Sequence, residues 1–105
     1  MSDLRRYEIF LPQKFNDGQP VPEELIADTL FELREQFGAV SWGTRAIRGM
    51  WQHEGIVFRD DLIRVFVDVP DLPANRQFFR QLKERLRVRF RQIEIRVTTY
   101  PVDLV

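Results

Sequence analysis

Three segments of the chain alternate hydrophobic and polar residues, which is typical of strands that bury one face. They are residues 5–11, 63–69 and 93–99, and the alternation is strictest in the second of them. A less regular run, residues 40–47, predicts a further strand. Pro101 is expected to close the last strand, because proline cannot donate a hydrogen bond to a central ladder.

Two longer segments place apolar residues every three or four positions, the spacing of an amphipathic helix. The first follows Pro22, which suits the first helical position, and ends at Gly38, which suits the C-cap. The second runs from Ala74 or Asn75 to Phe90. The apolar stripes are Ile26, Leu30, Leu33 and Phe37 in the first helix, and Phe79, Leu82, Leu86 and Phe90 in the second.

The centre of the chain predicts a hairpin. The second strand is expected to continue irregularly through Trp51, and His53-Glu54-Gly55 has the composition of a turn. An extended run resumes at Ile56. Asp60-Asp61 is then expected to break or bulge the strand.

The order strand, helix, strand, strand, helix, strand defines the architecture. Each helix has a single apolar stripe, so both must cover the same face of one sheet. We therefore predict an α+β fold of the ferredoxin-like split βαβ type (βαββαβ), with an antiparallel sheet, two helices on one face and an extended central hairpin as an elaboration. Residues 1–105 form a single domain, because no linker or repeat divides them. Beneath the helical stripes, the expected core comprises Ile9, Leu11, Ile63, Val65, Val67, Ile93, Ile95 and Val97.

This topology leaves one face of the sheet without helices. Phe10 and Phe66 fall on it among charged residues, and burying each ring would contribute about 1.5–3 kcal/mol. Either arginine stems and the hairpin shield the rings within one chain, or a second copy of the chain covers them. We expect a homodimer or higher homo-oligomer that uses the sheet face and the central hairpin. The expected interface residues are Phe10, Met50, Trp51, Ile56, Arg64, Phe66 and Arg96.

Composition narrows the possible chemistry. The chain has 105 residues and no cysteine, which excludes disulfides, a thiolate nucleophile and cysteine-ligated metal sites. No apolar run reaches the roughly 20 residues of a membrane span, and the start of the chain lacks signal-peptide features. We therefore expect a cytoplasmic protein without membrane contact.

The charges balance in total but are unevenly distributed. Residues 1–38 contain four basic and eight acidic residues, whereas residues 72–105 contain eight basic and three acidic ones. As neighbours in one layer, an acidic first helix and a basic second helix should neutralise each other, which makes nucleic-acid binding the less favoured interpretation. The acidic residues are Glu23, Glu24, Asp28, Glu32 and Glu35, and the basic stripe is Arg76, Arg80, Lys83, Arg87 and Arg91.

A ligand-binding role is the main alternative. His53 is the sole histidine and lies close to acidic residues in the sequence, although the same residues suit a turn. A dimeric α/β-barrel-type enzyme or small-molecule binder would use a pocket lined by Trp42, Arg48, Trp51 and His53. The sequence shows no phosphate loop, nucleophile elbow or metal-ligand spacing. We therefore assign no catalytic residue, metal or cofactor, and favour a role other than catalysis.

Three segments carry a resemblance to other proteins: RRYEIFLP (residues 5–12), GMWQHEGIVFRDD (49–61) and NRQFFRQLKERL (75–86). The sequence resembles a group of short, uncharacterised bacterial proteins over nearly its whole length. This resemblance implies a small cytoplasmic bacterial protein with a ferredoxin-like fold. It transfers no catalytic residue onto this sequence.

Overall fold

The computed structural model describes the backbone of residues 3–43, 47–53 and 56–105, and the side chains of residues 3–43 and 62–105. Within these ranges the helices and strands follow one another in the predicted order, with the second strand divided in two. They are β1 (Leu4–Pro12), α1 (Glu23–Phe37), β2 (Ser41–Trp42), β3 (Ile47–His53), β4 (Ile56–Pro70), α2 (Pro73–Arg89) and β5 (Val97–Val102).

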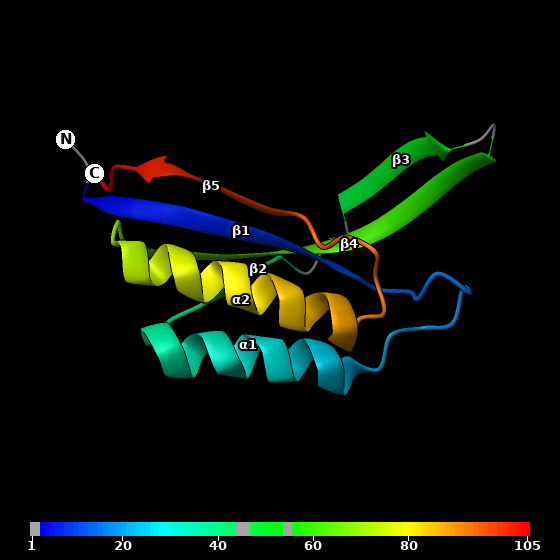
Figure 1. Ribbon diagram of the computed structural model, residues 1–105, viewed down its shortest axis with the longest axis horizontal. Helices are drawn as coiled ribbons and strands as arrows, with labels where there is room; N and C mark the ends of the chain where they lie inside the picture. Colours follow the sequence, from blue (N-terminus) through cyan, green and yellow to red (C-terminus); the bar gives the residue numbers. More distant parts are fainter. Residues whose placement is uncertain (1–2, 44–46, 54–55) are drawn as a thin grey trace.

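The strands form one antiparallel sheet. Its order is β2-β4-β1-β5, and β3 pairs with β4 beyond β2. Both helices lie on the same side of the sheet (Figure 1). β2 and β3 together take the place of the second strand of the ferredoxin-like split βαβ sandwich. The predicted fold class is confirmed.

The predicted hairpin is confirmed as β3 and β4, but its strands differ from the expected ones. The break expected at Asp60-Asp61 is wrong, because Asp60 pairs with Gly49 and Asp61 with Arg48 in an unshifted register. β3 supplies a partner for each of these residues, which outweighs the low strand propensity of aspartate. The predicted turn includes Glu54 and Gly55, which lie outside the described residues.

The last strand begins later than the alternation predicts. Arg91 has a φ of 54° just after α2, and the chain uses residues 91–96 to return to the sheet before β5 starts at Val97. Ile93 lies in this connection and is 85% exposed, so its predicted place in the core is wrong. Pro101 lies inside β5 and does not close the strand.

Pro101 is tolerated because β5 is an edge strand. The Phe10 N–H donates to the Arg96 carbonyl at 3.1 Å, so the even-numbered residues of β1 direct their backbone groups toward β5. Their partners in β5 include Thr98 and Tyr100. The next residue, Pro101, therefore directs its nitrogen away from the sheet, where no ladder hydrogen bond is lost.

The core lies between the sheet and the two helices. Tyr7 of β1 stacks on Phe79 of α2 with ring centroids 4.0 Å apart, and Phe79 stacks on Phe37 of α1 at 5.3 Å. This aromatic column joins both helices to the sheet. The predicted core residues other than Ile93 are buried or packed against the buried cluster; those with the lowest exposure are Ile9, Leu11, Leu33, Val65, Leu82, Leu86 and Phe90.

Both ends of α1 reflect the local sequence. Gly38 has a φ of 82° and donates its N–H to the Arg34 carbonyl at 2.7 Å, as expected for a glycine C-cap. The sequence predicts Pro22 at the first helical position. In the structure Pro22 is the N-cap residue, one position earlier, and the helix begins at Glu23. A shift of one residue at a helix end leaves the packing of the stripe unchanged.

Tyr7 carries a buried hydroxyl that has no hydrogen-bond partner within the part of the chain that the structure describes. We expect Tyr7→Phe to raise the free energy of unfolding by about 1 kcal/mol, because the ring stack is kept and an unsatisfied polar group is removed. Urea denaturation followed by circular dichroism measures the change. A loss of stability would instead mean that the hydroxyl makes a bond that supports the fold.

Candidate functional site

The face of the sheet opposite α1 and α2 carries the candidate site, and we call it the helix-free face. Alternation along the strands places every second residue of β1, β4 and β5 on this face. Its charged, aromatic and hydroxyl residues in the described part of these strands are Arg6, Glu8, Phe10, Arg64, Phe66, Asp68, Thr98 and Tyr100.

Phe66 lies between two guanidinium groups on the helix-free face. The Cζ atoms of Arg6 and Arg64 lie 4.3 and 4.5 Å from the centroid of its ring. Arg6 donates two hydrogen bonds to Asp68, of 2.7 Å from Nε and 3.0 Å from Nη2. This bidentate pairing raises the pKa of Arg6 and fixes its guanidinium in place. Each cation–π contact adds roughly 0.5–1 kcal/mol, so the ring is held firmly without full burial.

Glu8 is the buried charge of this face, with 8% of its surface exposed. Arg64 donates from Nη2 to its Oε1 at 2.5 Å, and the Tyr100 hydroxyl donates to the same oxygen. Hydrogen bonding to Arg64 lowers the pKa of Glu8, although burial alone would raise it, and Glu8 in turn raises the pKa of Arg64. Glu8 is therefore ionised at neutral pH and positions both Arg64 and Tyr100.

Phe10 is half-buried on the same face. The Arg96 Cζ lies 5.7 Å from the centroid of its ring. Phe10 and Phe66 are thus each shielded in part by arginine side chains of their own chain. This shielding is one of the two alternatives that the sequence left open, the other being cover by a second copy. The helix-free face is consequently a mixed aromatic and charged surface.

A second feature, which we call the arm, consists of residues 47–53 and 56–61. It continues past β1, whose last residue, Pro12, pairs with Leu62. The arm is a two-stranded ribbon about 20 Å long. It rises away from α1 and α2, so neither helix covers it (Figure 1). Six of its thirteen residues are apolar: Ile47, Met50, Trp51, Ile56, Val57 and Phe58.

The structure divides the residues predicted for the interface into two groups. On or beside the helix-free face lie Phe10, Arg64, Phe66 and Arg96. On the arm lie Met50, Trp51 and Ile56, whose side chains fall outside the described part of the chain. The helix-free face and the arm are continuous, because β4 runs through both.

The residues predicted for a ligand pocket do not gather within one chain. Trp42 pairs with Val65 and is 49% exposed, whereas His53 pairs with Ile56 at the end of the arm. Val65 and Ile56 are nine residues apart in one strand, a separation of about 30 Å. The remaining two positions, Arg48 and Trp51, lie along the arm. A site that used all four residues would need a second copy of the chain.

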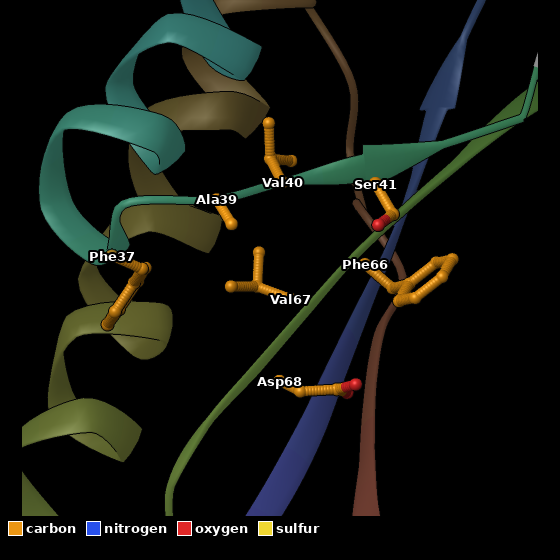
Figure 2. Close-up of a pocket in the computed structure, with 7 residues that line it drawn as sticks. All are labelled: Phe37, Ala39, Val40, Ser41, Phe66, Val67 and Asp68. Atoms are coloured by element: carbon orange, nitrogen blue, oxygen red, sulfur yellow. The ribbon is translucent and has the colours of Figure 1, made fainter. Parts of the chain in front are cut away.

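A small pocket opens at the edge of β4, beside the start of β2. Figure 2 shows the chain passing from α1 beside Val67 before it pairs with β4 at Ser41. The volume is about 150 Å³, below the roughly 300–1,000 Å³ of typical ligand sites. The Asp68 carboxylate in its lining is already bonded to Arg6. The lining residues are Phe37, Ala39, Val40, Ser41, Phe66, Val67 and Asp68.

The two helices neutralise each other only in part, and not through the predicted stripe. Arg85 and Arg89 both bind Glu32 of α1, Arg89 at 3.1 Å. These arginines lie one turn apart and so share the side of α2 that meets α1, whereas the predicted stripe follows another side. Two stripe residues are paired with carboxylates outside α1: Lys83 with Glu94 at 2.5 Å, and Arg87 with Glu84 at 2.8 Å.

Neither a cluster of metal-ligating side chains nor a membrane-spanning helix is found in the described part of the chain. No group there of three or more His, Cys, Asp or Glu residues is placed to hold a metal ion. No helix in the same part has the length and apolar character needed to cross a membrane.

Sequence reasoning missed two residues of the helix-free face, Arg6 and Tyr100. Arg6 lies two residues before Glu8 and follows from the alternation of the first strand. Tyr100 lies two residues after Thr98, and the same alternation finds it once Pro101 is recognised as a proline of an edge strand.

No protein-family model matches the chain, and no curated protein matches it by sequence. A phage SAM lyase in complex with S-methyl-5'-thioadenosine has a TM-score of 0.71 at 18% identity, over 96% of this chain and 83% of that chain. The divalent cation tolerance protein CutA1 from Thermus thermophilus has a TM-score of 0.63 at 16% identity, over 97% and 86% of the two chains. CutA1 from Oryza sativa has a TM-score of 0.63 at 14% identity, over 97% and 82%.

The chain shares its ferredoxin-like fold with these proteins. At such low identities the similarity shows the fold and transfers no residue role. The ferredoxin-like fold implied by the resemblance of residues 5–12, 49–61 and 75–86 is thereby confirmed. The group of bacterial proteins, and with it a cytoplasmic location, stays a prediction.

Glu8→Gln tests the charge network of the helix-free face. Because the pKa of Glu8 is lowered in the folded protein, ionised Glu8 stabilises the fold above its unfolded-state pKa. That stabilisation is lost as the pH falls through the folded-state pKa. We expect Glu8→Gln to lower the free energy of unfolding by about 2 kcal/mol at neutral pH. Urea denaturation at a series of pH values should show the difference from the wild type shrinking below about pH 4.

Glu94→Gln provides the matched control. The pKa of Glu94 is also lowered, through its hydrogen bond to Lys83, but its side chain is exposed. We expect this variant to unfold almost as the wild type does, because exposed ion pairs contribute little. Equal losses in the two variants would contradict the special role of the buried carboxylate.

Proposed function

We propose that this protein is a homo-oligomeric interaction module that associates through the arm and the helix-free face. The main support for the proposal is the extension of the apolar arm away from the helices. A two-stranded ribbon is marginally stable on its own in water, and nearly half the residues of this ribbon are apolar. Burial against a second copy would stabilise it by about 25 cal/mol per Å² of apolar surface removed from water.

The helix-free face adds support to this proposal. Phe10 and Phe66 remain half-buried in the single chain, and Arg64 and Tyr100 are already ordered by Glu8. Aromatic residues and arginine are the types enriched in protein interfaces, and side chains ordered beforehand lose less entropy on association.

The two alternatives are less well supported. A small-molecule site that includes Trp42 and His53 requires two chains, since about 30 Å of strand separates their positions in one. Self-association would therefore precede ligand binding. Nucleic-acid binding by the basic stripe is disfavoured because Lys83 and Arg87 are already paired with carboxylates.

Phe66→Arg tests self-association. We expect the wild type to sediment as an oligomer and Phe66→Arg as a monomer, because a third guanidinium would replace the ring between Arg6 and Arg64. Sedimentation velocity measures the mass, and circular dichroism checks that the variant is folded. Phe66→Thr removes the ring without adding charge and should also weaken association.

Phe31→Arg is the matched control. Phe31 is 62% exposed on α1, on the opposite side of the sheet from the helix-free face. We expect this variant to keep the oligomeric mass of the wild type. A monomeric wild type, or an oligomer that a folded Phe66→Arg leaves intact, would contradict the proposal.

A further inference from the structure

Two neighbouring surfaces, the arm and the helix-free face, lie away from both helices of the described structure (Figure 1). The arm diverges from the body beyond Leu62 and cannot fold back over its own helix-free face without breaking the continuous ladder of β4. The two surfaces are similar in size. The arm is about 20 Å long, and the nine residues of β1 give the helix-free face a length of about 30 Å.

The charges of the two surfaces distinguish the possible pairings. By alternation, one face of the arm carries Trp51, Phe58 and Asp60, and with His53 neutral Asp60 is the one charged residue among the described positions of that face, a net charge of −1. The helix-free face with Arg96 beside it contains three arginines and two carboxylates, a net charge of +1. Two faces, or two arms, would bring like net charges together, whereas an arm against a face brings opposite charges together.

The ion pairs of the helix-free face argue in the same direction. Arg64 is bonded to Glu8 and Arg6 to Asp68 within one chain, so two stacked faces would desolvate all of these ions and supply no new partner. A narrow ribbon laid over the aromatic rings would leave much of the charged surface in contact with water. Arg96, which makes no ion pair among the described residues, would meet the face of the arm that carries Asp60.

We propose that the arm of one copy lies across the helix-free face of a neighbouring copy, over Phe10 and Phe66. This inference rests on the proposed self-association and specifies its geometry. Each copy then contributes two different surfaces to the assembly.

Mixing two defective variants tests this geometry. Trp51→Glu damages the arm and Phe66→Arg damages the face, so each variant alone should be monomeric. In a mixture, the intact arm of Phe66→Arg can bind the intact face of Trp51→Glu. We therefore expect sedimentation velocity to show a 1:1 dimer in the mixture and no dimer in either variant alone. If circular dichroism shows that Trp51→Glu is unfolded, Trp51→Thr is used in its place. Phe66→Thr likewise replaces an unfolded Phe66→Arg.

The other outcomes overturn the geometry in distinguishable ways. If Trp51→Glu alone remains oligomeric, the contact is between two faces; if Phe66→Arg alone remains oligomeric, it is between two arms. Two monomeric variants that fail to combine when mixed also contradict arm-to-face contact. A monomeric wild type instead removes the proposed function itself.

Cysteine cross-linking gives an independent measurement, because the chain contains no cysteine of its own. His53→Cys places a single thiol on the same face of the arm as Trp51, and Thr98→Cys places one on the helix-free face. We expect a disulfide-linked dimer mainly when these two variants are mixed and oxidised. Gln77→Cys on the exposed surface of α2 replaces Thr98→Cys in the control mixture and should not form the link. Efficient linkage of Thr98→Cys to itself would contradict the proposal.

Discussion

β4 pairs with β1 over residues 62–70 and with β3 over residues 56–62, so one uninterrupted strand belongs both to the compact body and to the arm. The body part is secured by the core, in which Tyr7, Phe79 and Phe37 stack across three elements. The backbone pairing described for the arm is that of its own hairpin, β3 with β4. Because the strand does not bend back at Leu62, the fold itself presents the arm to the surroundings.

The helix-free face shows how charges can order aromatic rings without burying them completely. Asp68 holds Arg6, and Glu8 holds Arg64, so two arginine side chains lose their freedom before any partner arrives. Their guanidinium groups in turn hold Phe66. Burial of Glu8 has a desolvation cost, which the hydrogen bonds from Arg64 and Tyr100 offset. The result is a surface that is rigid and still polar.

Periodicity predicted most of the fold, because each amphipathic element has one apolar stripe and only one layer can cover it. It failed where a tertiary constraint outweighed the local pattern. Ile93 has the right spacing for a strand, but the chain needs that length to leave α2 and reach the sheet. Asp60-Asp61 looks like a break, yet the pairing with β3 continues through it.

The candidate site was only partly predictable, for a related reason. Alternation finds which residues share a face, including Phe10, Arg64 and Phe66, but it carries no information about which charged groups meet. The pairing of Glu8 with both Arg64 and Tyr100 depends on the register of three strands. In the same way, the proximity of Trp42 to Trp51 and His53 in the sequence concealed the fact that they pair with distant parts of β4.

Pro101 has a consequence for how far such chains can associate. An exposed edge strand with a full row of free N–H groups is a template for open-ended sheet growth and fibril formation. Pro101 removes one donor from the outer row of β5. This edge is thereby a poor template for another strand, so aggregation through it is disfavoured. The arm, which extends from the other side of the sheet, stays available for a finite assembly.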